Sequence, residues 1–409
     1  MLAERPLDRW RALRVRSPWS GLALRVAGRL AAGRLILELP DGSEHVFEGR
    51  RPGPQGRLRL IRPRALRRYV TGGALGFAEA YVDRDWDTPD LPPLLELLAL
   101  NEEAYAGERR ALSLDRLRAR LAHLVRANTR RGSRRNILSH YDLGNAFFQR
   151  WLDPGMTYSA ARFGHGDGHG DESLEQAQRR KFESLAGMLA LRPDAHLLEI
   201  GCGWGGFAEF AAREAGARVT AITISNEQHA YARERIQKAG LTERVEVRLQ
   251  DYRDVQGRFD AIGSIEMFEA VGERYWPLFF AHLRDLLRQG GRAGLQVITI
   301  GDEHFESYRR GCDFIQRHVF PGGMLPSPAA LTREIGRAGL VEEARVAFGR
   351  DYARTLGCWN RRFQVAWAEL RSLGFDDRFK RLWDFYLAYC EAGFRVGFTD
   401  VLQLGLVRR

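Results

Sequence analysis

Three absences limit what this chain of 409 residues can be. No uninterrupted apolar run approaches the roughly 20 residues that span a bilayer, which argues against an integral membrane protein. The first 16 residues are basic but lack the apolar core and the small-residue cleavage site of a secretory signal. The four cysteines stand far apart without metal-ligand spacing, which indicates free thiols in a reducing compartment. We therefore expect a cytoplasmic protein.

Lysine is also scarce. Only Lys181, Lys238 and Lys380 contribute to the 63 basic residues, and the rest are arginines, which outnumber the acids to give a net charge of +11. An arginine-rich composition is typical of GC-rich genomes. It is equally typical of proteins attracted to a polyanion, either a nucleic acid or an anionic lipid surface. Charge alone does not separate these interpretations.

The first 106 residues are predicted to form a small α/β domain. Residues 34–39 and 44–48 read as two strands of a hairpin around a Pro-Asp-Gly turn. A further strand at 57–61 precedes a helical stretch that reaches Gly72-Gly73, and residues 91–100 read as a short buried helix.

Residues 107–135 differ in composition from the rest of the chain. They hold ten arginines but only two acids, and Leu114, Leu117, Leu121 and Leu124 recur at helical spacing. Such a basic amphipathic helix could lie on an anionic membrane, or it could pack its leucines between two domains. In either case we predict a linker here, between a first domain at 1–106 and a second at 136–409.

A candidate cofactor loop opens the second domain. The apolar strand 196–200 runs into Gly201-Cys-Gly-Trp-Gly-Gly206, and a helix over 207–215 follows at once. This is the nucleotide-cradling unit of a doubly wound sheet. The spacing is not that of the dinucleotide loop, however. It resembles motif I of class I S-adenosylmethionine methyltransferases, in which the acid, here Glu199, suits the ammonium of the cofactor.

The following segments continue the alternation of strands and helices. Further strands are predicted at 217–223, 245–249, 259–265 and 294–300, the last after a Gly290-Gly291 turn. The pattern predicts an α/β fold with a doubly wound, mainly parallel sheet and a ligand at the carboxyl ends of its strands. Gln250-Asp251 would read an adenine edge, and Thr223 stands where an acid usually takes the ribose hydroxyls.

Several motifs in this half carry a specific resemblance. From about residue 135 onward the chain resembles the cyclopropane-fatty-acyl-phospholipid synthase family, which includes the mycolic acid cyclopropane synthases and related fatty-acyl methyltransferases. A weaker likeness to the lipid-binding N-terminal domain of the bacterial phospholipid enzymes appears in residues 73–81 and 85–87. The motifs are His140-Tyr-Asp-Leu-Gly-Asn145, Leu152-Asp-Pro-Gly-Met-Thr-Tyr-Ser159, Leu198-Glu-Ile-Gly-Cys-Gly-Trp-Gly-Gly206, Thr223-Ile-Ser225 with Gln228, Met267-Phe-Glu-Ala-Val-Gly272 and Phe320-Pro-Gly-Gly-Met-Leu-Pro-Ser327.

The resemblance implies an enzyme that works from the cytoplasmic face of a membrane on unsaturated acyl chains of phospholipids. It places S-adenosylmethionine against Tyr158, Ser159, Gly201, Gly203, Gln228 and Asp251, with Thr223 as the ribose residue. Methyl transfer to an alkene leaves a carbocation, which aromatic faces can stabilise. A base must then remove a proton.

In cyclopropane synthases that base is thought to be a bound bicarbonate. Glu269 and Tyr352 match two of its ligands, and Ile300 matches its backbone donor. The cysteine and histidine ligands are replaced by Ala160 and Ile298, which puts both bicarbonate and ring closure in doubt. We therefore expect either a methyl-branched or methylene acyl chain or a cyclopropane, with a slight preference for the branched product, and Gln296 is a candidate member of an altered base site.

Two other classes of function stay open on the sequence. A non-catalytic relative that binds cofactor and lipid would explain Ala160 and Ile298. A nucleic-acid methyltransferase would use the positive charge, but we find no recognisable nucleic-acid module and expect no such partner. No metal is expected either, since the two histidines of the glycine-rich loop 164–170 have no further ligands nearby. A homodimer is one option for the assembly.

Overall fold

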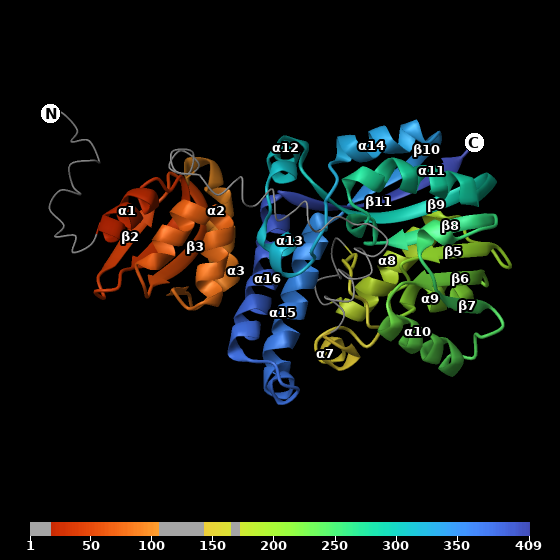
Figure 1. Cartoon of the computed structure of the whole chain (residues 1–409), viewed down its shortest axis with the longest axis horizontal. Helices are drawn as coiled ribbons and strands as arrows, with labels where there is room; N and C mark the ends of the chain where they lie inside the picture. Colours follow the sequence, from red (N-terminus) through yellow and green to blue (C-terminus); the bar gives the residue numbers. More distant parts are fainter. Residues whose placement is uncertain (1–17, 106–142, 165–171) are drawn as a thin grey trace. The chain divides into compact units, whose positions relative to one another are not determined.

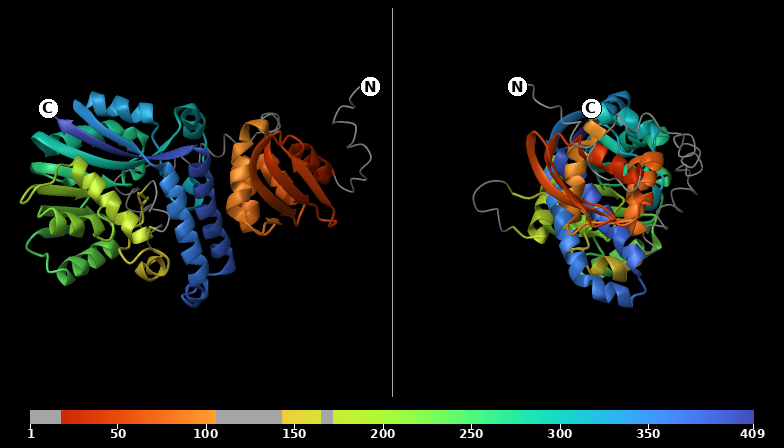
Figure 2. Two further views of the ribbon diagram at one scale, coloured as in Figure 1. Left: turned by 180° about the vertical axis from the view of Figure 1, so that it is seen from behind. Right: turned by 90° about the vertical axis from the view of Figure 1, so that its left-hand side faces the viewer.

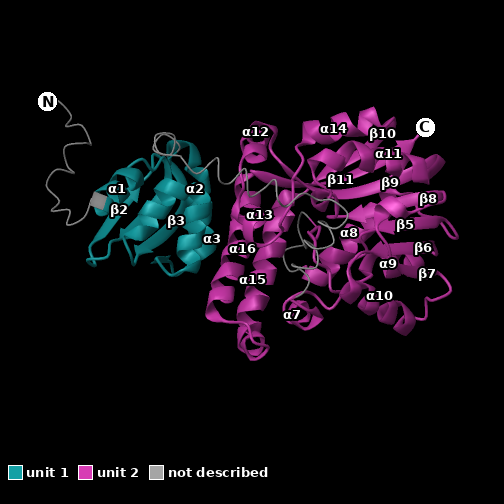
Figure 3. Cartoon of the chain, viewed as in Figure 1, with its two compact units in different colours: residues 1–115 teal, residues 116–409 magenta. Residues whose placement is uncertain are grey.

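The computed structural model of this protein describes residues 18–105, 143–164 and 172–409. The chain divides into two compact units, residues 1–115 and 116–409 (Figure 3). The predicted basic linker at 107–135 and most of the glycine-rich loop 164–170 lie outside the described residues. In the part of the chain that is described, no helix is long and apolar enough to cross a membrane.

The first unit is a small α/β layer structure. Its sheet has the order β2-β1-β3-β4, with β1 antiparallel to β2 and parallel to β3. Alternating buried leucines of β1, such as Leu35 and Leu37, face the core, as a half-buried strand requires. The elements are α1 (Pro18–Ala27), β1 (Ala32–Glu38), β2 (Glu44–Glu48), β3 (Arg51–Leu60), α2 (Arg64–Val82), β4 (Trp86–Asp87) and α3 (Leu91–Leu100).

The second unit is built on a seven-stranded sheet with the order β10-β11-β9-β8-β5-β6-β7 (Figure 1). Strands β5 to β9 run parallel, and β10 and β11 are antiparallel additions at one edge. The strands are β5 (His196–Ile200), β6 (Arg218–Thr223), β7 (Val245–Leu249), β8 (Phe259–Ile265), β9 (Leu287–Ile300), β10 (Leu340–Ala347) and β11 (Thr399–Arg408).

Helices cover both faces of this sheet, as the contacts of two successive side chains of β5 show. Leu197 of β5 packs in a core with α8 and α9, whereas its neighbour Leu198 packs in a core with α11 and α14. Successive side chains of a strand point to opposite faces, so the two helix groups lie on opposite sides. These helices are α8 (Leu174–Met188), α9 (Gly206–Glu214), α10 (Asn226–Lys238), α11 (Trp276–Leu286) and α14 (Pro328–Arg337).

The remaining helices cluster near the ends of the central strands. The two long helices α15 (Gly349–Ser372) and α16 (Asp377–Val396) lie side by side, as both views of Figure 2 also show in blue. One short helix, α7 (Asn145–Gln149), comes before β5 in the chain. The other short helices follow central strands: η2 (Tyr252–Asp254) after β7, η3 (Phe268–Ala270) and η4 (Glu273–Tyr275) after β8, and α12 (Asp302–Arg310) and α13 (Phe314–His318) after β9.

Two local predictions were wrong, and two strands of the sheet were not predicted. Helix α2 continues past Gly72-Gly73 to Val82, although Gly73 leaves the helical conformation with a φ of +60°. The Gly290-Gly291 pair does not make a turn before the fifth strand. Instead β9 begins at Leu287 and runs through both glycines, and a register shift between Phe259 and Ala261 absorbs the irregularity. The sheet also gains β10 and β11, because its open edge is completed from the C-terminal part of the chain.

Candidate active site

The loop between β5 and α9 has the backbone that its glycines predict. Gly201, Gly203 and Gly205 all adopt positive φ, at +81°, +52° and +84°. Residues with a Cβ rarely adopt this conformation. A Cβ on Gly201 would also lie 2.8 Å from Cγ of Met267. The loop is therefore shaped for close approach of a ligand to its backbone, ahead of the N-terminus of α9.

Glu199, the acid before this loop, is buried at 3% exposure. Its carboxyl accepts a hydrogen bond from the amide of Ala208, while Oε2 has no partner among the described residues. Burial raises the pKa of Glu199 to about 8. An orphan buried oxygen beside a glycine loop is suited to receive an ammonium, which would also restore the charged carboxylate.

The end of β6 carries a second pair of cofactor candidates. The Thr223 hydroxyl donates to Oε1 of Gln228 over 2.8 Å, and both side chains are buried. Ser225 caps α10 through the backbone amide of Gln228. Because the Gln228 carbonyl oxygen is used by Thr223, the amide NH2 is left to donate to a ligand. The structure thus brings these two predicted residues together.

Gln250 and Asp251, the predicted adenine readers, are engaged locally. Both Asp251 oxygens accept hydrogen bonds from Arg253, at 2.8 and 2.6 Å, and Gln250 donates to the Asp254 carbonyl over 3.0 Å. Contact of either side chain with adenine therefore stays a prediction.

Tyr158 and Ser159 enter the same region from the segment before α8. The Tyr158 ring lies against the ring of Trp359, at 5.2 Å between centroids, and its hydroxyl shares a hydrogen bond of 2.7 Å with Tyr386. The Ser159 hydroxyl accepts from Nζ of Lys181 over 2.7 Å. Lys181 is fully buried, and burial lowers its pKa to about 7. Nearby carboxylates, of which Glu266 contributes most, act in the opposite direction and raise the pKa.

Glu266 is the residue that the sequence analysis missed. It follows β8 directly, and three donors converge on its carboxylate. Oε1 accepts from the Ala160 amide at 2.8 Å and from Nε2 of Gln296 at 2.7 Å, and Oε2 accepts from the Tyr352 hydroxyl at 3.0 Å. An acid at the carboxyl end of a central parallel strand is a signal that could have identified it.

Gln296 is held in one orientation by its neighbour across the sheet. The antiparallel register of β9 and β11 places Gln403 opposite Gln296, and Nε2 of Gln403 donates to Oε1 of Gln296 over 3.1 Å. Gln403 in turn accepts from Ser184 and donates to the Lys181 carbonyl. With its oxygen occupied, Gln296 must present its NH2 group to Glu266.

Glu269, a predicted catalytic residue, lies on η3 close to Glu266. Its Oε1 accepts from the Ile298 amide at 2.5 Å, and its Oε2 has no partner among the described residues. Burial, followed by the neighbouring Glu266 charge, raises the pKa of Glu269 to about 8. Burial also raises the pKa of Glu266, but four groups oppose this: Gln296, the Ala160 amide, Lys181 and Tyr352. Glu266 is therefore the better stabilised carboxylate of the pair.

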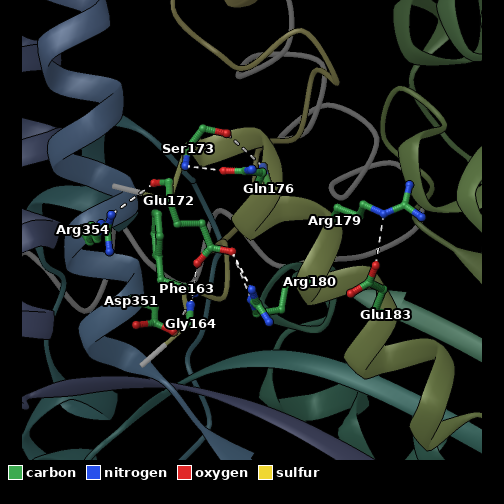
Figure 4. Close-up of polar contacts among 10 residues, drawn as sticks. All are labelled: Phe163, Gly164, Glu172, Ser173, Gln176, Arg179, Arg180, Glu183, Asp351 and Arg354. Carbon is green, nitrogen blue, oxygen red and sulfur yellow. Dashed lines mark hydrogen bonds and ion pairs between the residues drawn. The ribbon is translucent and has the colours of Figure 1, made fainter. Parts of the chain in front are cut away.

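The segment that presents Ala160 is anchored on both sides of the glycine-rich loop (Figure 4). The Phe163 amide donates to Asp351 of α15 over 3.0 Å, and the Arg354 guanidinium lies 4.0 Å from the centroid of the Phe163 ring. Glu172 accepts from the Gly164 amide, and its backbone carbonyl accepts from Arg354. These contacts fix the approach of Ala160 to α15, the helix that carries Tyr352.

These residues do not fit a bound bicarbonate. The donors that would hold the anion are occupied, since Ala160, Gln296 and Tyr352 already bind Glu266. The expected backbone donor, the Ile300 amide, instead donates to the Pro326 carbonyl over 3.0 Å, which corrects that prediction. A second anion beside the Glu266 carboxylate would also be repelled.

No cluster of three or more potential metal ligands occurs within residues 18–105, 143–164 and 172–409. The site instead combines three features at neighbouring strand ends. These are a loop whose glycines adopt positive φ, a buried acid with one oxygen that lacks a partner among the described residues, and a hydrogen-bonded Thr–Gln pair. Together with the seven-stranded sheet, these features define a class I S-adenosylmethionine-dependent methyltransferase.

Comparisons with known proteins agree with this class and narrow it. Residues 128–404 match the family model of mycolic acid cyclopropane synthetase. The chain is 39% identical to a tuberculostearic acid methyltransferase of Mycobacterium tuberculosis, over 98% of this chain and 96% of the relative. It is 34% identical to the cyclopropane-fatty-acyl-phospholipid synthase of Escherichia coli, over 85% and 86%. A mycolic acid cyclopropane synthase solved with S-adenosylhomocysteine superposes with a TM-score of 0.62 at 28% identity, covering 67% of this chain and 98% of that one.

The chain belongs to the mycolic acid cyclopropane synthetase family. It is an S-adenosylmethionine-dependent methyltransferase of the group that modifies acyl chains of lipids. The family resemblance, the fold class and the cofactor predicted from the sequence are thereby confirmed.

Proposed function

We propose that this enzyme transfers a one-carbon unit from S-adenosylmethionine to the double bond of an unsaturated acyl chain in membrane phospholipids, and that its product is an open branched chain, methyl-branched or methylene, instead of a cyclopropane. The observation that carries the proposal is the arrangement around Glu266. The fixed Glu266 carboxylate accepts from the amide of Ala160. Ala160 and Ile298 replace the cysteine and histidine expected of a ring-forming enzyme.

The cofactor roles follow from the geometry of the strand ends. We assign the methionine moiety to Glu199 and the loop of Gly201 and Gly203, and the ribose hydroxyls to Gln228 held by Thr223. Tyr158 and Ser159 would close the site from the segment before α8, and Gln250-Asp251 would lie toward the adenine. Holding the sulfonium against the alkene in a dry slot provides proximity and desolvation, which are the main assistance that such a poor nucleophile needs.

Aromatic rings are placed to stabilise the carbocation that methyl transfer leaves. The Trp359 ring lies between Tyr158 and Tyr352, at 5.2 and 5.9 Å between centroids. A cation near aromatic faces is stabilised by about 0.5–2 kcal/mol. We assign Trp359 to the acyl slot because it lies between Tyr158, a cofactor candidate, and Tyr352, which donates to Glu266.

The carbon atom that loses the proton decides whether a ring or an open chain forms. Loss of a proton from the newly added methyl group, with the cation on the adjacent carbon, closes a ring. Loss of a proton from a chain carbon, or loss after a hydride shift, leaves a branched alkene. Reduction of that alkene to a saturated branch would need a hydride donor from a separate enzyme. The long alignment with a tuberculostearic acid methyltransferase also favours the open chain.

The test is incubation of the full chain with labelled S-adenosylmethionine and vesicles of unsaturated phospholipid, followed by mass spectrometry before and after mild hydrogenation. A cyclopropane and a branched alkene have equal mass, but only the alkene takes up hydrogen. We expect a labelled acyl chain that takes up hydrogen. A product that resists hydrogenation would establish the ring, and tight cofactor binding without any labelled lipid would indicate a non-catalytic relative.

We further propose that the protein acts at the inner surface of the membrane, with the first unit as a lipid-interacting domain. The support is the net charge of +11 and the ten arginines of residues 107–135. Attraction to an anionic surface is screened by salt, with a Debye length of about 8 Å at physiological ionic strength. Activity on vesicles should therefore rise with the anionic lipid fraction and fall with added salt. Equal activity on neutral vesicles at high salt would contradict this.

A further inference from the structure

We propose that the Glu266 carboxylate is the general base of this enzyme. A side chain of the protein would thus remove the proton that a bound bicarbonate is assigned to remove in the ring-forming relatives. The inference rests on the proposed function, since it concerns the same acyl substrate. The alkene pair forms the new carbon–carbon bond to the methyl group, and the carbon–sulfur bond breaks with its electrons on sulfur. Glu266 then takes a proton from the resulting cation, and the freed C–H pair forms the new π bond. The products are S-adenosylhomocysteine, a branched alkene and protonated Glu266.

The first argument is that the carboxylate is oriented by a complete set of donors. The Ala160 amide and Gln296 hold Oε1, and Tyr352 holds Oε2. A carboxylate oxygen accepts two hydrogen bonds readily, so Oε2 retains a lone pair that no other hydrogen bond described above uses. Glu266 is half-buried and not fully enclosed, which a group that must reach a substrate requires.

The second argument concerns which acid is charged. A base must be ionised before the reaction, and the low dielectric of a buried site penalises every charge that has no partner. Glu266 has three hydrogen-bond donors and the nearby Lys181, whereas the side chain of Glu269 accepts from backbone amides only. Glu266 therefore ionises first, and the neutral Glu269 beside it avoids a pair of like charges.

The third argument comes from the backbone. Glu266 has a φ of +49°, in the left-handed region that side chains avoid. Such strain is unfavourable and persists only where the surrounding structure fixes it. Here the Glu266 amide donates to the Gln296 carbonyl over 2.8 Å. The next residue, Met267, packs on Gly201, so the strained turn lies beside the cofactor loop.

The test compares Glu266→Gln and Glu266→Ala with the wild type in buffer depleted of bicarbonate. We expect wild-type activity to be unaffected by depletion, and both variants to lose about 100- to 10,000-fold in kcat, the usual contribution of a general base. Formate or bicarbonate should restore part of the activity of Glu266→Ala, whose shortened side chain leaves room beside Ala160 and Gln296. Neither anion should help Glu266→Gln, which keeps that space filled.

Controls separate chemistry from folding and from the proposed function. Cofactor affinity, measured by calorimetry, should change less than about threefold in both variants, because Glu266 contacts no group that we assign to the cofactor. Glu234→Gln, at an exposed position on α10, should keep wild-type activity. Full activity in Glu266→Gln, or dependence of the wild type on bicarbonate, would overturn the assignment. A wild type that methylates no acyl chain would overturn the proposed function as well.

Discussion

Replacing Gln403 by methionine tests whether the orientation of Gln296 matters for the reaction. Gln403 is fully buried on β11, and methionine fills a similar volume without hydrogen-bonding groups. The substitution removes the bond of 3.1 Å that fixes Oε1 of Gln296. The Gln296 amide then loses the contact that holds it from the side of β11, so its NH2 group can move away from the position in which it donates best to Glu266.

The upper limit of the effect follows from the strength of the Gln296–Glu266 hydrogen bond that this movement weakens. A hydrogen bond to a charged acceptor contributes about 1.5–3 kcal/mol, which corresponds to roughly 10- to 150-fold in rate. The loss should appear in kcat, with little change in KM for S-adenosylmethionine. Without the Gln296 donor the pKa of Glu266 rises, so the acid limb of the kcat profile should move to higher pH.

Stability gives a second, separate readout. The Ser184 hydroxyl and the Lys181 carbonyl also lose their Gln403 partner, at about 0.5–1.5 kcal/mol of stability for each hydrogen bond, while Ser184 keeps its bond from Arg162. Thermal unfolding will therefore identify a variant that is merely unstable. Gln237→Met, at an exposed site on α10, is the matched control and should leave both readouts unchanged. A folded Gln403→Met enzyme with wild-type kcat and an unmoved pH profile would refute the positioning role.

Three further predictions concern the cofactor residues and the second acid. Gly201→Ala should abolish S-adenosylmethionine binding in a calorimetric titration, since φ is +81° and the new Cβ would meet Met267; retained affinity would remove the loop assignment. Thr223→Val should weaken cofactor binding about 5- to 10-fold by freeing the Gln228 amide, and unchanged affinity would contradict the ribose role. Glu269 has a raised folded pKa of about 8, so its contribution to stability is complete below its unfolded pKa and is lost as pH rises through about 8. The melting temperature of Glu269→Gln should therefore rise relative to the wild type between about pH 5 and pH 8, and the difference should stay level at higher pH; a constant difference throughout would contradict the raised pKa.

Much of the central sheet could be predicted because its strands are short apolar runs between glycine turns and capped helices. The strands at 196–200, 245–249 and 259–265 have the predicted bounds, and α8 begins with a capping box formed by Ser173 and Gln176. The Gly290-Gly291 turn failed because a glycine pair is equally compatible with an irregular strand, and only the pairing of Leu287 with Phe259 decides between them. Strands β10 and β11 depend on long-range pairing at the sheet edge, which local pattern does not encode.

The candidate site was only partly accessible to sequence reasoning. Tyr352 and Gln296 were singled out, and the structure brings both to one carboxylate. That carboxylate belongs to Glu266, which was missed because the family comparison directed attention to Glu269, three residues later. The Gln403 contact was also invisible, since it arises from the antiparallel register of β9 and β11. Side chains that meet from elements far apart in the sequence can be assigned to one site only when the fold is known.

The central claim is that this enzyme methylates an unsaturated acyl chain and leaves an open-chain product. The most direct measurement is proton NMR of the acyl chains released after reaction of the full protein with S-adenosylmethionine carrying a carbon-13 methyl group and unsaturated phospholipid vesicles. The account predicts labelled carbon in a branched alkene, formed at the same rate with and without bicarbonate. A label confined to a cyclopropane methylene, formed only when bicarbonate is present, would contradict it.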